Sequence, residues 1–201
     1  MSKVDVSEFK GPLGELMDQC SPENGGRKRF EEFNLWLKGV TGKLLKHLRD
    51  VGLGPVKKFE AAKKFTKNNP LVKFWDFGTN FTTYFGNRVE KNVAAMTIAV
   101  SRLERRAKDP EITNELAGET KRVFRISLAH FYQMIETQGQ VQADGPLLVN
   151  GYANIAYIED MDNWAVNANW NAGYGWYVHA SPVGDPNPWD GESQVLSRKS
   201  A

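Results

Sequence analysis

The sequence has very little of the residues that build disulfide frameworks and metal centres. Its 201 residues include a single cysteine, Cys20, and three histidines. A lone cysteine cannot form an internal disulfide bond, and a zinc site needs three or four ligands at set spacings that this sequence lacks. The glycine-rich loops that bind dinucleotides or phosphates are also missing, since Gly42-Lys43 is followed by Leu44. We therefore expect no metal centre and no cofactor.

Long apolar runs are absent as well. The longest apolar stretches span only a few residues, whereas a membrane helix needs about 20. The first nine residues, Met1 to Phe9, have no apolar segment of the signal-peptide kind. A content of 41% hydrophobic and 25% charged residues is typical of soluble globular chains. The sequence predicts a protein without a membrane partner.

The charge is divided along the chain. Residues 1–125 hold 24 of the 26 Lys and Arg but 16 of the 24 Asp and Glu, so the acidic excess lies in the last 76 residues. Such segregation of charge would let the basic part bind a polyanion such as nucleic acid. It would equally let the basic part of one copy of the chain bind the acidic part of a second copy. Two solvated faces that happen to differ would give the same pattern.

The spacing of apolar residues predicts helices first and strands last. Residues 1–26 are expected to form an N-terminal arm, and 27–138 a mainly helical region that includes a basic segment at 27–73. Apolar residues recur every three or four positions in three stretches, and a short lysine-rich helix is expected as well. We therefore expect about four amphipathic helices, over 27–51, 56–67, 89–107 and 112–138, the last with room for a break near Gly118. Alternating aromatics at 77–85 predict an extended segment.

The C-terminal third predicts a sheet. Residues 139–180 are β-rich, and from Trp164 to Ala180 an apolar residue occupies every second position. This run is about three times a typical strand length, which favours a hairpin turning at 171–173 with an aromatic face. Residues 181–201 are expected to form an extended tail. The fold class is α+β, with an antiparallel aromatic-faced sheet and extended terminal arms.

The aromatic residues of this sheet are candidates for a subunit interface. One chain offers few elements to cover them, so we expect a neighbouring subunit to do so, in a homo-oligomer. The candidate interface residues are Trp164, Trp170, Tyr174, Trp176 and Trp189.

Three short segments resemble a known family. The start Val4-Asp5-Val6-Ser7-Glu8-Phe9, the element Thr41-Gly42-Lys43-Leu44 and the segment Asn150 to Glu159 resemble parts of the tail-completion (neck) proteins of long-tailed bacteriophages. The resemblance covers about 25 residues and implies a structural protein that self-assembles at a head–tail junction in the virion, with other virion proteins as partners. It implies no catalytic residues.

Two alternative functions stay open. A nucleic-acid-binding coat or packaging protein would use basic residues on phosphates, with Phe59, Phe65, Phe74 and Trp75 as stacking platforms. The candidate nucleic-acid-binding residues are Arg27, Lys28, Arg29, Lys57, Lys58, Lys63, Lys64 and Lys67. An enzyme of unrecognised type would need Glu159, Asp160 and His179 to converge. We expect no enzyme, because no motif supports one.

Overall fold

The computed structural model describes residues 43–118, 123–138 and 145–199. The chain divides into two units, Met1–Lys43 and Leu44–Ala201, and the account below concerns the second. The expected arm at 1–26, Arg27 to Arg29 and most of the first expected helix lie outside the described residues.

The described residues form nine strands and four helices. The strands are β1 (Leu45–Leu53), β2 (Val56–Glu60), β3 (Phe74–Phe77), β4 (Val89–Val93), β5 (Met96–Leu103), β6 (Asn154–Tyr157), β7 (Trp164–Asn171), β8 (Gly175–Pro182) and β9 (Gln194–Arg198). The helices are α3 (Ala61–Lys64), α4 (Thr79–Phe85), α5 (Asp109–Ala117) and α6 (Leu128–Gln138). None of these helices is long and apolar enough to cross a lipid bilayer.

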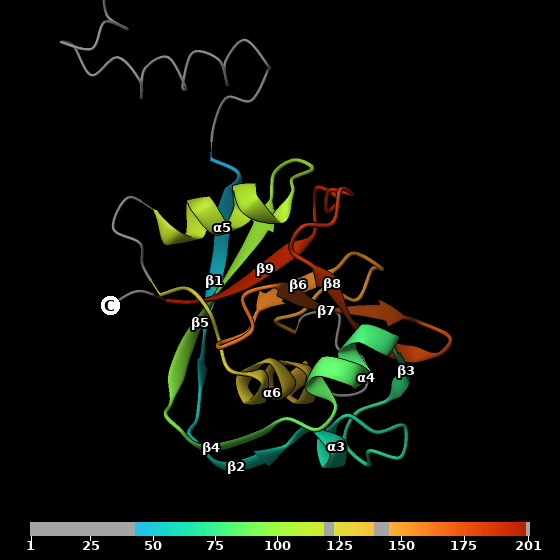
Figure 1. The fold of residues 1–201 in the computed structure, drawn as a ribbon. Coiled ribbons are helices and arrows are strands. Elements are labelled where there is room, and N and C mark those ends of the chain that lie inside the picture. Colours follow the sequence, from blue (N-terminus) through green and yellow to red (C-terminus); the bar gives the residue numbers. More distant parts are fainter. Residues whose placement is uncertain (1–42, 119–122, 139–144, 200–201) are drawn as a thin grey trace, which may run out of the picture. The chain divides into compact units, whose positions relative to one another are not determined.

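Seven of the strands form one mixed sheet in the order β1-β5-β9-β6-β7-β8-β3 (Figure 1). The pairs β6/β9 and β3/β8 are parallel and the other pairs are antiparallel. Strands β2 and β4 form a separate two-stranded ribbon. The sheet therefore combines strands from both halves of the described chain.

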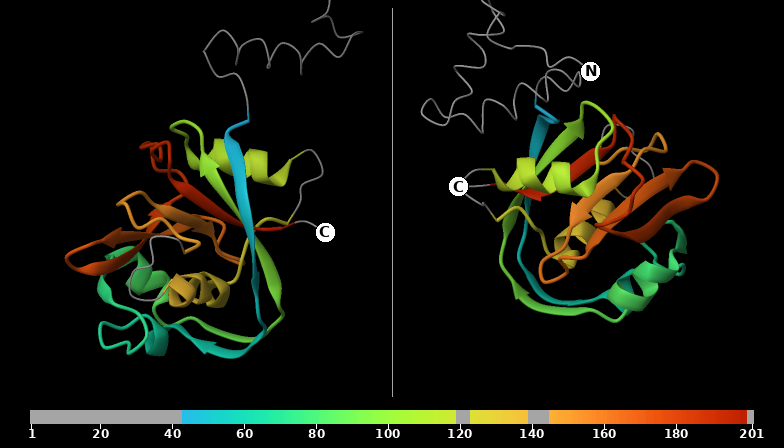
Figure 2. Two further views of the ribbon diagram at one scale, coloured as in Figure 1. Left: turned by 180° about the vertical axis from the view of Figure 1, so that it is seen from behind. Right: turned by 45° about the horizontal axis from the view of Figure 1, so that its top comes forward.

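Each face of the sheet is covered by helices (Figure 2). Helix α6 buries eight of its eleven residues, and its Phe131 and Ile135 share the larger core with Trp176 of β8. Helix α5 covers the other face through Ile112, which packs in a second cluster with Tyr157 and Val195. The alternation of side chains along the strands thus supplies two cores.

The α+β class is confirmed, but several expected elements are wrong. Residues 45–53 form β1 and residues 89–103 form β4 and β5, where helices were expected. In β5 the buried Met96, Ile98 and Val100 alternate with period two, a pattern that coexists with the helical spacing of the same segment. Pairing with β1 and β9 decides in favour of the strand.

The segment around 77–85 shows the opposite error. Helix α4 replaces the expected extended segment, because Phe77, Phe81 and Phe85 are spaced four apart and their rings stack in sequence at 6.1 and 5.7 Å. The expected lysine-rich helix is reduced to α3, preceded by β2. The expected break near Gly118 is confirmed, since α5 ends at Ala117 and α6 begins at Leu128.

The hairpin is confirmed and the C-terminal tail is corrected. Strands β7 and β8 pair from Trp164 opposite Pro182 to Asn171 opposite Gly175. The segment expected to be an extended tail supplies β9, which lies between β5 and β6 in the middle of the sheet. Its Val195 and Leu196 are buried, one in each core, which an arm would not allow.

Candidate functional site

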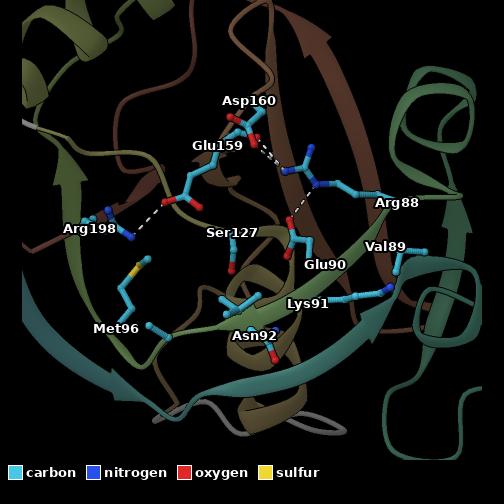
Figure 3. Close-up of a pocket in the computed structure, with 12 residues that line it drawn as sticks. Arg88, Val89, Glu90, Lys91, Asn92, Met96, Ser127, Glu159, Asp160 and Arg198 are labelled. Carbon is cyan, nitrogen blue, oxygen red and sulfur yellow. Dashed lines mark hydrogen bonds and ion pairs between the residues drawn. The ribbon is translucent and has the colours of Figure 1, made fainter.

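A charged cleft of about 410 Å³ lies between β4, the start of α6 and the end of β9 (Figure 3). Its walls bring together segments distant in the sequence, namely residues 88–94, Ser127, the turn at Glu159 and Asp160, and Arg198. Three carboxylates and three basic side chains line it, so positive and negative groups balance.

Two arginines organise the carboxylates of this cleft. Arg88 donates to Glu90 at 2.7 Å and to the carbonyl oxygen of Glu159 at 2.9 Å, and it lies 3.8 Å from the Asp160 carboxylate. Arg198 pairs with the Glu159 carboxylate at 3.0 Å from the opposite side. The Arg88 side chain is 19% exposed and Glu90 only 9%, so this pair is shielded from water and the Asp160 carboxylate, at 92%, is not.

Glu90 also holds the first turn of α6. Its two carboxylate oxygens accept the backbone N–H groups of Leu128 and Ala129 at 3.1 and 2.8 Å. The first N–H groups of a helix have no partner within the helix, and a carboxylate there is favoured by the helix dipole. Glu90 therefore joins β4, α6 and Arg88 into one rigid wall of the cleft.

Ser127 caps the same helix and contacts His130. Ser127 Oγ accepts the backbone N–H of His130 at 3.1 Å and lies 2.8 Å from His130 Nδ1. Burial lowers the pKa of His130, and the nearby charge of Arg198 lowers it further, against the opposing effects of the Gly54 backbone and Glu90. The imidazole is fully buried. Ser127 therefore has the geometry of an N-cap residue, and His130 packs on its hydroxyl, so we assign the pair a structural role.

Strand β4 presents an edge to this cleft. It pairs with β2 on one side, and among the described residues no strand pairs with its other side, along which the cleft runs. Two of the three described non-glycine residues with positive φ, Asn92 (53°) and Asp160 (61°), line the cleft. Asn and Asp adopt this conformation most readily, and Asn92 interrupts the regular edge of the strand.

A second exposed feature lies at the β3 edge of the sheet. Trp75 of β3 stacks on Tyr174 of the β7–β8 turn, with ring centroids 5.1 Å apart and planes inclined by 25°. Trp75 is 43% exposed and Tyr174 59%. Strand β3 ends the sheet, pairing on one side with β8 and with no described strand on the other. We call Trp75, Tyr174 and β3 the aromatic edge.

The five residues expected at a subunit interface differ in their exposure to solvent. Trp170 and Trp176 are 4% and 0% exposed and pack edge to face, 5.3 Å apart, beneath this chain's own helices. Their assignment to an interface is therefore wrong, because the chain itself covers them. Trp164 is half-buried against Tyr84, with ring centroids 4.4 Å apart.

Trp189 is also directed inward. Its Nε1–H donates to the buried carboxylate of Asp109 at 2.8 Å, and its side chain belongs to the smaller core. Of the five, Tyr174 alone is largely exposed.

Four of the five candidate nucleic-acid-binding lysines that the structure describes pair with carboxylates. Lys58 and Lys63 both pair with Glu60, and these two hydrogen bonds lower the pKa of Glu60 to about 2. Lys64 lies 3.5 Å from Glu136 and Lys67 2.9 Å from Asp76, while no pair involves Lys57 among the described residues.

The expected stacking platforms are wrong in three of four cases. Phe59, Phe65 and Phe74 are 2%, 8% and 5% exposed and belong to the larger core. Trp75 is the exposed member of the set.

The residues that an enzyme would need do not converge. Glu159 and Asp160 line the charged cleft, whereas His179 lines a separate hollow. The sequence analysis missed Arg88, Glu90 and Arg198, since nothing in the local pattern shows that their segments meet. No group of three or more His, Cys, Asp or Glu able to hold a metal ion occurs among residues 43–118, 123–138 and 145–199.

Comparison with known proteins finds no matching family model, no matching curated protein and no matching solved structure.

Proposed function

We propose that this chain is a structural protein that assembles with copies of itself through the aromatic edge. The observation that carries the proposal is the stacked pair Trp75 and Tyr174, exposed together beside the unpaired side of β3. Roughly 100 Å² of each ring faces water, so covering both would contribute about 5 kcal/mol at about 25 cal/mol per Å². An open strand edge adds unpaired backbone groups that a neighbour can satisfy.

The charged cleft supports the same function as a second contact. It offers the open side of β4, fixed arginines and the exposed Asp160 carboxylate to an extended segment of a neighbouring copy. The division of charge along the sequence gives two copies complementary parts to bring together.

The setting that we propose is the virion, at the head–tail junction of a long-tailed bacteriophage. The resemblance of residues 4–9, 41–44 and 150–159 to tail-completion proteins supports this choice. Pairing of Lys58, Lys63 and Lys67 with carboxylates leaves less free positive charge for phosphates, which disfavours the nucleic-acid alternative.

Size-exclusion chromatography with light scattering on the full chain tests assembly. We expect masses that are multiples of 22.6 kDa, and a shift to monomer in the double variant Trp75→Ala, Tyr174→Ala. Tyr84→Ala is the matched control, since Tyr84 is 50% exposed but lies on α4. A wild-type chain that stays monomeric at all concentrations, or a double variant that assembles normally, would contradict the proposal. Salt-sensitive retention of single- or double-stranded nucleic acid on filters would favour the alternative.

A further inference from the structure

A small polar hollow, separate from the charged cleft, opens beside the start of α5. Its volume is about 150 Å³, and it lies between that helix, the end of β8 and the loop from β8 to β9 (Figure 1). One buried water needs only about 10–15 Å³ of such space, whereas pockets for drug-sized ligands begin near roughly 300 Å³. The hollow therefore has the size for one ion and a few waters.

Oxygen atoms are the groups that this hollow offers to a ligand. The carboxylates of Asp109 and Asp185 line it, together with Ser181 and Asn187. Asn187 Nδ2 donates to Asp185 Oδ1 at 3.0 Å, so the amide nitrogen is used and the amide oxygen has no hydrogen-bond partner among the described residues. The Ser181 hydroxyl adds another oxygen that can accept. The lining thus provides carboxylate and neutral oxygens, and its nitrogen donors are already engaged.

The Asp109 carboxylate is buried and has one oxygen without a partner. Tyr157 and Trp189 both donate to its Oδ1, at 2.7 and 2.8 Å, and no described residue donates to its Oδ2. Asp109 is only 2% exposed, yet Oδ2 is not among the unpartnered atoms of the described chain that are sealed from solvent. Since Asp109 lines the hollow, its second oxygen is accessible from there. A buried carboxylate in this state needs a further partner.

No basic side chain of the described residues neutralises these carboxylates. Among those residues, no Lys, Arg or His lines the hollow or pairs with Asp109 or Asp185. Burial raises the pKa of Asp109 against the hydrogen bonds from Tyr157 and Trp189, and the charge of Asp185 raises it further, so the two carboxylates lie close enough to repel each other. Buried charges in proteins are paired or bind metal ions. The hollow therefore favours a cation and disfavours an anion.

We propose that this hollow binds one calcium ion. Asp109 Oδ2 and the Asp185 carboxylate supply the negative charge, Ser181 and Asn187 supply neutral oxygens, and waters complete the about six to eight oxygen ligands that calcium takes. Oxygen ligands suit a hard cation, and an irregular set suits calcium better than magnesium, which needs near-ideal octahedral geometry. The ion ties the loop before β9 to the start of α5. This site is independent of the aromatic edge and of the proposed assembly.

Calorimetric titration of calcium chloride into the full chain, treated with EDTA and desalted, tests the site. We expect one site with a dissociation constant on the order of 10⁻⁴–10⁻³ M, the range of weakly charged calcium sites, and weaker binding of magnesium. Asp185→Asn removes one carboxylate and keeps an oxygen for Asn187, so calcium should bind at least tenfold more weakly. Asp190→Asn is the matched control, since Asp190 lies in the same loop but pairs with Arg106 outside the hollow, and it should bind calcium as the wild type does.

Two further measurements keep the test decisive. Asp109→Asn keeps the oxygen that accepts both hydrogen bonds, and it should also bind calcium at least tenfold more weakly. Calcium should raise the melting temperature of the wild type and of Asp190→Asn, because a ligand of the folded chain stabilises it, and sodium chloride of equal ionic strength should not.

The calcium site is overturned if the wild type binds no calcium at ten times the expected dissociation constant, or if sodium gives the same rise in melting temperature. It is also overturned if Asp185→Asn and Asp109→Asn bind calcium as tightly as Asp190→Asn does.

Discussion

The indole Nε1–H of Trp189 and the phenolic O–H of Tyr157 donate to the same carboxylate oxygen of Asp109, at 2.8 and 2.7 Å. This relationship between Asp109 and Trp189 joins residues 80 positions apart. It fixes the segment before β9 against the start of α5, and it holds the half-buried Trp189 side chain against the smaller core of this chain.

Asp109 gives a pH-dependent prediction. Burial raises the pKa of this carboxyl, although Tyr157 and Trp189 donate to it. A carboxyl with a higher pKa in the folded chain than in the unfolded chain favours folding below its ordinary value near 3.8, and this contribution is lost as the pH rises through the folded pKa. The stability of the wild type relative to Asp109→Asn should therefore fall between pH 4 and pH 7, measured by urea unfolding.

The asparagine keeps the oxygen that accepts both hydrogen bonds and removes the buried charge. Asp109→Ala removes that acceptor and should cost about 2–3 kcal/mol at neutral pH, because the buried Tyr157 hydroxyl and the half-buried Trp189 indole lose their partner. A difference between wild type and Asp109→Asn that does not change with pH would contradict this account of Asp109.

Glu90 should be important for the stability of the fold. Glu90→Ala removes the acceptor of two N–H groups of α6 and the shielded partner of Arg88, so we expect a loss of about 2–4 kcal/mol in the free energy of unfolding. Glu104→Ala is the control, since Glu104 pairs with Arg102 at the surface and should cost under about 1 kcal/mol. Equal losses in chemical denaturation would argue against the role of Glu90 at the helix start.

Gly78 allows α4 to approach β8. A Cβ atom at this position would lie 2.7 Å from His179 Cβ, closer than side chains approach. Gly78→Ala should destabilise the chain by about 1–3 kcal/mol. Gly52→Ala is the control, because nothing lies within 4 Å of a Cβ there and alanine suits a strand better than glycine. Thermal unfolding of the two variants should move in opposite directions, and a neutral Gly78→Ala would show that α4 can shift freely.

The sequence predicted the type of element correctly where the apolar residues follow a single periodicity. The prediction was wrong where helical and strand periodicities coexist in one segment. From Trp164 to Ala180 the alternation has no competing helical pattern, and the hairpin follows. In β5, Val100 belongs both to a period-two set with Met96 and Ile98 and to a helical series, so local spacing alone does not decide. Pairing with β9, almost 100 residues later, decides it.

The candidate sites were less predictable because they depend on that long-range pairing. Inserting β9 between β5 and β6 brings Arg198 to Glu159. The segment before it brings Asp185 and Trp189 to Asp109 in one hollow. No local sequence pattern indicates that these residues lie close together in the fold. Sequence reasoning did single out Tyr174, as one of the aromatic residues on one face of the predicted sheet, and Tyr174 is largely exposed.

Hydroxyl-radical footprinting across a dilution series tests the central claim, that copies of this chain cover one another's aromatic edge. Oxidation of Trp75 and Tyr174 should fall as the protein concentration and the mass measured in parallel rise, while oxidation of Tyr84 stays constant. Equal oxidation of Trp75 and Tyr174 at every concentration, in a chain whose mass remains 22.6 kDa, would contradict the account.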